Sequence, residues 1–388
     1  MRPFSKISLA WLQLTHHKLR LLVALLGIAF AAILIFIQLA FLDSLYESQT
    51  AVHQRMKADL VLVDGRLRTL SRGYSFSQQY LYRMLNFAEV ESVNPVQYRR
   101  QSFKYGNTAG GKGIIVLGIN PDHCPFDIPN FDQVAHLLRT KNVVLFDRNS
   151  DMKEYEDLVN DFETGKTITV EVGNKRALIG GLIDFAGASF ADDGNIIASD
   201  TTFFNLLPAL SRNTIAVGLI KLKPGVDQTA ALYRIARQLP KNVRLMTQKD
   251  FVKHEKNYWV SSAPIGFLFT VGVCVSFFVG VVIVCQILYT EITDHLPDYA
   301  VLKARGFKHR YFLSVLFQEA LILAVLGYIP GFAISLGLYE FVHNATALPM
   351  HMTFSRAILV FLLTIMMCFT SGTISMNKLR EADPAELF

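Results

Sequence analysis

The sequence predicts an α-helical membrane protein with four transmembrane helices and a large α/β extracytoplasmic domain between the first two. Hydrophobic residues make up 51% of the 388 residues, charged residues only 18%, and the mean hydropathy is +0.31. Soluble domains carry about 25% charged residues. The deficit is confined to four stretches without any Asp, Glu, Lys or Arg, and the rest has an ordinary soluble composition. A wholly soluble enzyme, a small disulfide scaffold and a disordered chain are therefore excluded.

Each charge-free stretch is long enough for a helix of roughly 20 residues to cross a bilayer. The charge-free stretches are residues 21–42, 264–289, 320–339 and 357–376. The third predicted span begins earlier, so the predicted spans are residues 21–42, 264–289, 313–339 and 357–376. The first is longer than the apolar core of a secretory signal, and no small-x-small cleavage site follows Phe41, so we interpret it as an uncleaved anchor.

The distribution of Lys and Arg sets the expected orientation, because cytoplasmic loops carry the excess of positive charge. The N-terminal segment 1–20 contains four basic and no acidic residues, residues 290–312 contain four basic residues, and the tail 377–388 contains Lys378 and Arg380. The loop 340–356 has Arg356 as its single basic residue. We therefore expect a multi-pass protein of the inner or plasma membrane, with both termini in the cytoplasm and residues 43–263 in the periplasm.

The domain 43–263 holds 27 Lys and Arg against 24 Asp and Glu, which excludes a nucleic-acid-binding surface. Strand and helix patterns predict an α/β part, residues 58–120 with 213–247, interrupted by a β-rich insertion, residues 121–212. Within the α/β part, we expect a helix at Ser77–Ala88 and a strand at Val93–Lys104. Cys124 is the single cysteine of the domain, so a disulfide within it is excluded.

Two segments that flank the domain have helical patterns. Asp43–Lys57 contains neither Gly nor Pro, which predicts that the first span continues outward as a helix. Gln248–Ala263, before the second span, has a similar pattern. Together they would form a stalk between membrane and domain. The alternative is two ordinary interfacial helix ends, with Trp259 in the aromatic belt.

No sequence motif predicts a catalytic, nucleotide-binding or metal-binding site. Gly106–Gly113 resembles a phosphate-binding loop, but Gly113 stands where a Ser or Thr would hold magnesium, and a strand follows it. Ser189 lies in an incomplete nucleophile-elbow pattern. His and Cys residues lack ligand spacing, so we assign no metal, cofactor or catalytic residue. We predict a non-enzymatic protein whose energy comes from a partner.

The cytoplasmic segment 290–312 contains a short helix with capping signals at both ends. Pro297 and Asp298 favour its start, Lys303 favours its end, and Gly306 can form the C-terminal cap. Its apolar residues include Tyr299 and Leu302, which could dock onto a partner. The alternative is a capped interfacial helix without a partner.

The spans also carry small residues at helical spacing. Gly327, Gly331 and Ser335 form one such row, which permits close helix packing in lipid. Glu319 lies at the edge of the third span, where an ionisable group is a functional candidate. A structural interfacial carboxylate, neutralised by Lys308 or Arg310, is the alternative.

The layout and three motifs resemble the MacB/FtsX superfamily of ABC-transporter permeases. The motifs are Asp298–Gly306 (DYAVLKARG), Gln318-Glu319-Ala320 with the two glycines that follow, and Ala382-Asp383-Pro384-Ala385. The first motif, with Tyr299-Ala300 in place of the usual Ile-Gly, is most similar to that of the DevC-type permeases of heterocyst exporters.

This resemblance implies a MacB-like domain and a homodimer in the membrane lipid that binds two copies of a separate ATP-binding cassette ATPase. It also implies a periplasmic membrane-fusion protein and a TolC-like outer-membrane channel, with glycolipid as a possible cargo. Residues Asp298, Tyr299, Leu302, Lys303 and Gly306 would couple to the ATPase. Two alternatives within the superfamily are an FtsX-like regulator of a cell-wall hydrolase and a Lol-like lipoprotein-release permease.

Overall fold

The computed structural model describes residues 18–106, 113–261, 264–294, 309–346 and 348–381. The chain divides into two compact units. The first, which we call the helical unit, contains the described residues up to Asp43, Phe267–Val342, and those from Met350 onward. The second, which we call the large domain, contains Ser44–Gly266 and His343–Pro349.

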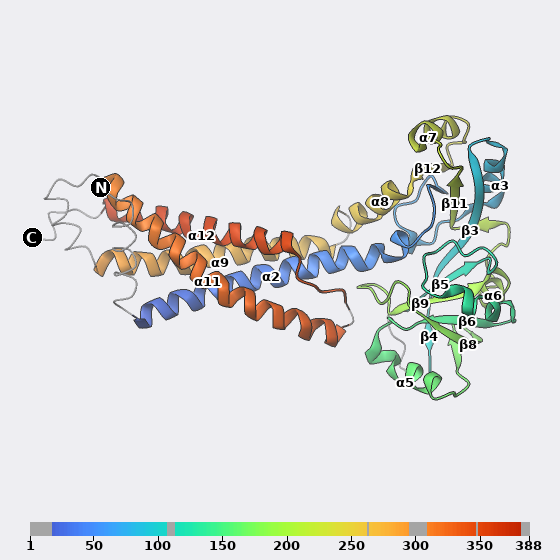
Figure 1. The fold of residues 1–388 in the computed structure, drawn as a ribbon, viewed down its shortest axis with the longest axis horizontal. Helices are drawn as coiled ribbons and strands as arrows, with labels where there is room; N and C mark the ends of the chain where they lie inside the picture. The colour runs from blue at the N-terminus through green and yellow to red at the C-terminus, as the bar shows by residue number, and fades with distance from the viewer. Residues whose placement is uncertain (1–17, 107–112, 262–263, 295–308, 347, 382–388) are drawn as a thin grey trace, which may run out of the picture. The chain divides into compact units, whose positions relative to one another are not determined.

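Four helices of the described chain are long and apolar enough to cross a membrane. They are α2 (Lys18–Gln54), α9 (Pro264–Asp294), α11 (His309–Thr346) and α12 (Phe354–Glu381), and they run side by side in Figure 1. Each contains one of the predicted spans, and the large α/β domain follows the first of them. The predicted fold class is therefore confirmed.

The helices extend beyond the apolar stretches that predicted them. α2 continues through Gln54, because no Gly or Pro interrupts the polar residues after its span. Likewise, α11 continues to Thr346, so helix occupies the start of the region that the sequence predicts to be the loop 340–356.

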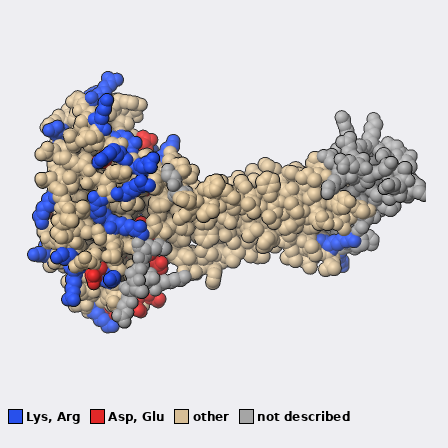
Figure 2. Space-filling view, turned by 180° about the vertical axis from the view of Figure 1, so that it is seen from behind, with Lys and Arg blue, Asp and Glu red and all other residues tan. Residues whose placement is uncertain are grey.

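Apolar side chains from all four helices pack together inside the helical unit. One cluster includes Ile28 and Ala31 of α2, Leu288 of α9, Leu323 of α11 and Met367 of α12. The visible outer face carries almost no charged side chains among the described residues, whereas the visible face of the large domain carries many (Figure 2). Such an apolar exterior is the surface that lipid requires.

The large domain is built on a ten-stranded sheet in the order β12-β1-β11-β3-β5-β9-β6-β8-β7-β4. Most neighbours are antiparallel, while β5 with β9 and β6 with β8 are parallel. The strands are β1 (Leu60–Asp64), β3 (Val90–Gln101), β4 (Phe103–Lys104), β5 (Ile114–Ile119), β6 (Val143–Asp147), β7 (Thr169–Val172), β8 (Lys175–Ile183), β9 (Gly194–Ser199), β11 (Val217–Leu222) and β12 (Val243–Thr247). A separate pair is formed by β2 (Phe76–Ser77) and β10 (Thr214–Ile215).

Short helices connect these strands. The α-helices are α3 (Gln78–Tyr82), α4 (Phe131–Val134), α5 (Met152–Glu163), α6 (Asp200–Leu206), α7 (Gln228–Ala236) and α8 (Gln248–Ser261). The 3-10 helices are η1 (Leu70–Arg72), η2 (Arg83–Asn86) and η3 (Ala135–Arg139). The helix predicted at Ser77–Ala88 is thus an α-helix only to Tyr82 and then tightens into η2.

The sheet joins the segments that the sequence divides into an α/β part and an insertion. β5, from the first part, pairs in parallel with β9 of residues 121–212, from Ile114↔Gly194 to Ile119↔Ser199. The strand predicted at Val93–Lys104 is also split, because β3 ends at Gln101 and β4 pairs instead with β7. Contacts between strands distant in sequence decide these details, and local patterns do not report them.

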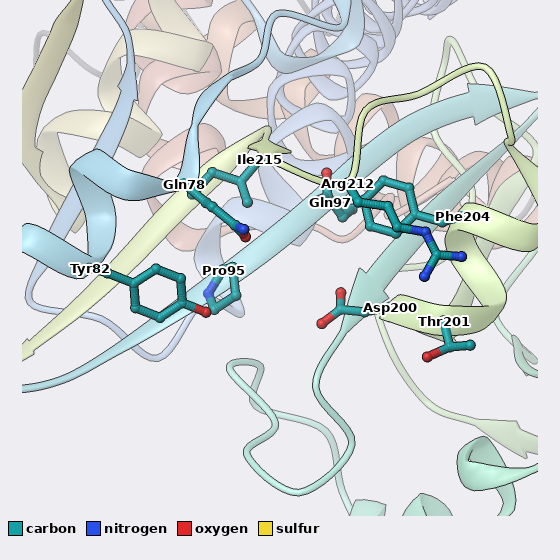
Figure 3. A pocket seen from close by; sticks show the side chains of 9 residues that line it. All are labelled: Gln78, Tyr82, Pro95, Gln97, Asp200, Thr201, Phe204, Arg212 and Ile215. Carbon is teal, nitrogen blue, oxygen red and sulfur yellow. The ribbon is translucent and has the colours of Figure 1, made fainter.

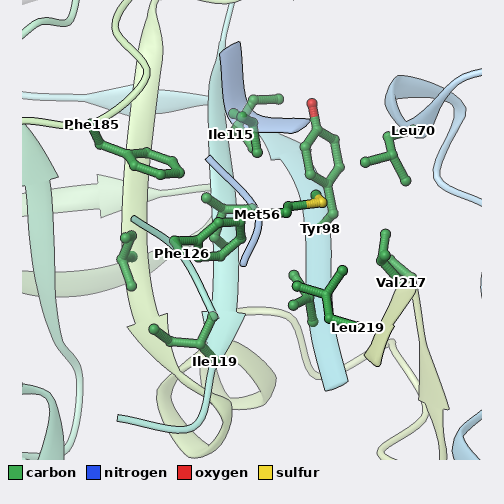
Figure 4. Packing of buried hydrophobic residues seen from close by; sticks show 14 of the residues in the cluster. Met56, Leu70, Tyr98, Ile115, Ile119, Phe126, Phe185, Val217 and Leu219 are labelled. Atoms are coloured by element: carbon green, nitrogen blue, oxygen red, sulfur yellow. The ribbon is translucent and has the colours of Figure 1, made fainter. Parts of the chain in front are cut away.

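Alternate residues of the buried strands pack on opposite faces of the sheet. On β5, Ile115 and Ile119 belong to one buried cluster, whereas Ile114 and Val116 belong to another, as the two-residue period of a strand requires. Figure 4 shows the first cluster, in which Met56 packs near Phe126 and Tyr98. This cluster also contains Val52 of α2 and Phe251 of α8. The core of the domain therefore includes residues from both segments that lead to the membrane helices.

Candidate functional site

The predicted ATPase-coupling residues lie outside the described residues. This applies to Asp298, Tyr299, Leu302, Lys303 and Gly306, and also to the tail motif Ala382–Ala385. Their roles stay predictions. The structure does describe Glu319, whose side chain is 1% exposed on α11, next to the buried Ala320.

Gly327 and Gly331 of α11 lie against α2. A Cβ atom built on Gly327 would lie 2.6 Å from Cγ2 of Ile28, and one on Gly331 would lie 3.1 Å from the carbonyl oxygen of Ala29. The third member of the row, Ser335, is fully buried and donates its hydroxyl to the carbonyl of Gly331 at 2.8 Å. The absence of side chains at these two glycines permits the backbones of α2 and α11 to approach closely.

α2 makes a second close contact with α9. A Cβ on Gly27 would lie 2.6 Å from Cγ2 of Ile283, and one on Gly280 would lie 2.8 Å from Cβ of Ala31. α2 is therefore packed tightly against two other helices of the helical unit. A change in the arrangement of α9 or α11 must displace α2 or open a void, and voids in packed interiors are destabilising.

An ion pair joins Asp43, the last residue of α2 within the helical unit, to Arg356 near the start of α12, and the Asp43 side chain is 53% exposed. The guanidinium of Arg356, 6% exposed, donates to Oδ2 of Asp43 at 2.7 Å through Nη2 and at 3.2 Å through Nε. Its Nη1 donates to the carbonyl of His351 at 2.9 Å. The guanidinium also lies over the ring of Tyr339 on α11, 5.4 Å from the centroid. The Tyr339 hydroxyl donates to the carbonyl of Phe36 on α2 at 2.6 Å.

The second polar cluster lies in the large domain, where Glu255 of α8 meets three groups from two other segments and one from α8 itself. Its Oε2 lies 3.4 Å from Nε2 of His53 on α2, with exposed fractions of 1% and 2% for the two side chains. Its carboxylate also accepts hydrogen bonds from the Thr69 hydroxyl, the Leu70 amide at 3.3 Å and the Trp259 indole at 3.1 Å. We call Glu255, His53, Thr69 and Trp259 the Glu255 clamp.

The Glu255 clamp favours an ionised carboxylate despite its burial. Burial by itself raises the pKa of Glu255, but the charge and hydrogen bond of His53, together with hydrogen bonds from Thr69 and Trp259, outweigh it and lower the pKa below its ordinary value. A buried carboxylate needs such partners, because an uncompensated buried charge is strongly destabilising. α2, α8 and the start of η1 are therefore held together by a charged group.

Further contacts fix the end of α2 inside the large domain. Nε2 of Gln248 donates to the carbonyl of His53 at 3.0 Å, and the ring of Phe251 lies 5.0 Å from that of His53. Nε2 of Gln49 donates to the hydroxyl of Ser189 at 3.3 Å. Ser189, the candidate of the elbow-like pattern, thus serves here as a polar contact of α2.

Sequence reasoning missed both charged clusters, although each had a signal. Glu255 lies four residues after Phe251 and four before Trp259, so a carboxylate interrupts the apolar face of a helix. Arg356 is the single basic residue in its loop and directly precedes an apolar span. The identities of His53 and Asp43 as partners could not be predicted, because these residues are distant in sequence.

Comparison with known proteins finds a family to which the C-terminal part of the chain is similar. Residues 270–384 match the family described as FtsX-like permease C-terminal, which covers the helices α9, α11 and α12. This match covers under a third of the chain, and it supports the expected assignment to the MacB/FtsX superfamily of ABC-transporter permeases.

One curated relative of this chain is the "Putative hemin transport system permease protein HrtB" of Staphylococcus haemolyticus. It is 19% identical over 227 residues, which are 58% of this chain and 60% of the relative. The chain thus spans about three fifths of the length of that relative.

Two solved structures of domains outside the membrane are similar to part of the chain. The periplasmic region of MacB from Actinobacillus actinomycetemcomitans has a TM-score of 0.37 at 14% identity, with 53% of this chain and 96% of that chain covered. The extracellular domain of the ABC-type transporter YknZ from Gram-positive bacteria has a TM-score of 0.33 at 12% identity, with 49% and 98% covered.

Proposed function

We propose that the chain is the permease subunit of an ATP-driven exporter, in which movement of the helical unit is passed to a large domain outside the membrane. A separate ATP-binding cassette subunit would hydrolyse the nucleotide. Both termini and the segment 290–312 would face the cytoplasm, and two copies of the chain would form the working dimer. The family match supports the permease role, and the Lys and Arg distribution supports the orientation.

The observation that carries the proposal is the set of contacts along α2. This helix is continuous from Lys18 to Gln54, is packed against α9 and α11 through glycines, and ends in the Glu255 clamp. An uninterrupted helix transmits a displacement along its axis, because its hydrogen-bond ladder resists bending. Force applied to the helical unit would therefore reach α8 and η1 through α2.

We propose that the segment Asp298–Gly306 receives this force from the ATPase, with Leu302 as its apolar docking residue. Leu302→Asp should abolish ATPase binding and export while the protein still reaches the membrane, since burying an unpaired carboxylate costs several kcal/mol. Thr293→Asp adds the same charge at an exposed position of α9 and is the matched control. Unchanged ATPase binding in Leu302→Asp would contradict this docking role and favour a capped interfacial helix without a partner.

The partners outside the membrane follow from the DevC-type resemblance. We propose a membrane-fusion protein and a TolC-like channel, with the large domain pushing cargo outward. Affinity purification of the chain from native membranes tests this. Co-purified fusion protein and channel support export, a cell-wall hydrolase supports an FtsX-like regulator, and a lipoprotein carrier supports a Lol-like permease.

The cargo can be examined once the partners are known. Glycolipid is the first candidate from the DevC-type resemblance. Hemin is the second, because the relative from Staphylococcus haemolyticus bears that name. Transport of each by proteoliposomes that contain the chain and its ATPase would rank the two.

A further inference from the structure

The large domain has a pocket with two charged side chains, Asp200 and Arg212, that do not form an ion pair with each other. Its volume is about 210 Å³, and it lies where α3, β3, α6 and β10 meet. Figure 3 shows the carboxylate of Asp200 and the guanidinium of Arg212 toward one end and the phenol of Tyr82 toward the other. The ring of Phe204 forms part of the wall at the charged end.

The two charged side chains of this pocket differ from many others in the domain, which form ion pairs. Acids such as Asp161, Asp122 and Glu89 each form an ion pair with a nearby base. Within the described residues, neither Asp200 nor Arg212 forms an ion pair, although both line the same pocket.

The surroundings of each charge make it available to a ligand. Arg212 is exposed, and its guanidinium lies over the ring of Phe204, 5.7 Å from the centroid. Asp200 is half-buried, and burial raises its pKa to about 6. A carboxylate that loses hydration without gaining a partner binds a cation more favourably than an exposed one does.

The part of the wall that β3 contributes is held by a hydrogen bond to the segment beside it. Gln97 on β3 is 7% exposed, and its Nε2 donates to the carbonyl of Thr214 at 2.8 Å. This hydrogen bond fixes β3 against β10, so the pocket exists without a ligand. Preformed pockets with a few convergent polar groups are the usual form of small-molecule sites.

We propose that this pocket binds a small zwitterion, whose ammonium group pairs with Asp200 and whose carboxylate or phosphate pairs with Arg212. The volume admits a ligand about the size of one amino acid, with its side chain toward Tyr82. Ammonium with carboxylate is the chemistry of an amino acid, and ammonium with phosphate is the chemistry of an ethanolamine headgroup. The proposal does not depend on the export function, because it rests on the pocket alone.

Three ligands with the same ring but different charges test the proposal on the full chain in lipid nanodiscs at pH 7.5. They are phenylalanine, 2-phenylethylamine, which lacks the carboxylate, and 3-phenylpropionate, which lacks the ammonium group. Calorimetric titration should show phenylalanine binding at least tenfold more tightly than either analogue. O-phosphoethanolamine, titrated in parallel, distinguishes the sources: tighter binding than phenylalanine indicates a headgroup, and weaker binding indicates an amino acid.

Two variants test separately which group of the ligand Asp200 and Arg212 each bind. In Asp200→Asn, phenylalanine should bind no better than 3-phenylpropionate, and in Arg212→Gln no better than 2-phenylethylamine. Arg237→Gln, an exposed position of the same domain outside the pocket, should leave all affinities unchanged. Equal binding of the three ring compounds, or binding by neither zwitterion up to its solubility limit, would overturn the proposal. So would equal losses for all ligands in both variants, since these indicate a general effect on the fold.

Discussion

The carboxylate of Glu255 lies 3.4 Å from the imidazole of His53, and both side chains are almost completely buried. The two residues belong to α8 and α2, which are the segments of the large domain that connect to the transmembrane helices. This contact between a buried carboxylate and an imidazole holds the two segments in one register. Removing one partner is damaging, because the polar group that remains stays buried without it.

Replacement of Glu255 tests the role of the clamp in stability. We expect Glu255→Gln to lower the free energy of unfolding of the large domain by about 3 kcal/mol, because the charge on which His53 and Leu70 depend is lost. Thermal unfolding of the full chain in nanodiscs measures this, with Trp259 fluorescence as the probe. Glu156→Gln, at an exposed site on α5, is the control and should have no effect. Equal stability of both variants would show that the clamp contributes nothing.

The pH dependence of unfolding has a defined sign. The pKa of Glu255 lies below its ordinary value of 4.5, so the ionised form is favoured in the folded state. Its stabilisation is therefore present above about pH 4.5 and is lost as the pH falls through the lower pKa of the folded state. The difference in unfolding temperature between the wild type and Glu255→Gln should be constant near neutrality and shrink in acid. A difference that persists unchanged to pH 3 would contradict this account.

The close contact of α11 with α2 predicts a position-specific response to a larger side chain. Gly331→Leu should lower the unfolding temperature of the helical unit by at least roughly 5 °C, because even a Cβ would press on the backbone of Ala29. Gly337→Leu is the matched control on the same helix, since a Cβ there meets no atom within 4 Å. Helix assembly is measured by thermal unfolding in detergent, and equal tolerance of both substitutions would contradict the packing role.

Asp43 and Arg356 should behave as one unit in a double-mutant cycle. Arg356→Gln and Asp43→Asn should each destabilise the helical unit, and the double variant should lose hardly more than Arg356→Gln alone. Arg356→Lys should not restore stability, because an ammonium group cannot reproduce the fork of donors that reaches Asp43 and the His351 carbonyl. Losses that simply add would mean that the pair is not coupled.

Composition predicts the membrane helices well, because crossing a bilayer requires a long apolar segment that no tertiary contact can replace. The continuous apolar strands were also recognisable, as β5 and β9 show. The parallel pairing of β5 with β9 was not, because the register of a sheet depends on long-range contacts.

The charged clusters depend even more on tertiary contacts. Thr69 and Glu255 are 186 residues apart, and Asp43 and Arg356 are 313 apart. Nothing local in the sequence specifies these pairings. The row of Gly327 and Gly331 predicted a close helix contact, whereas only the structure shows that α2 is the helix opposite to it.

The central claim, that α2 carries movement from the helical unit to the large domain, is tested most directly by hydrogen–deuterium exchange with the ATPase bound. Glu47 is an exposed residue of α2. Glu47→Pro removes one backbone hydrogen bond of the helix and clashes with the preceding turn, which destabilises the helix by about 3 kcal/mol. Glu47→Ala leaves the helix intact and is the control. In the wild type and in Glu47→Ala, addition of a non-hydrolysable ATP analogue should change exchange in α9 and α11 and also in η1 and α8. In Glu47→Pro, the change should persist in α9 and α11 and disappear from η1 and α8, while the unliganded domain keeps its native exchange. An undiminished response of η1 and α8 in Glu47→Pro would contradict the account.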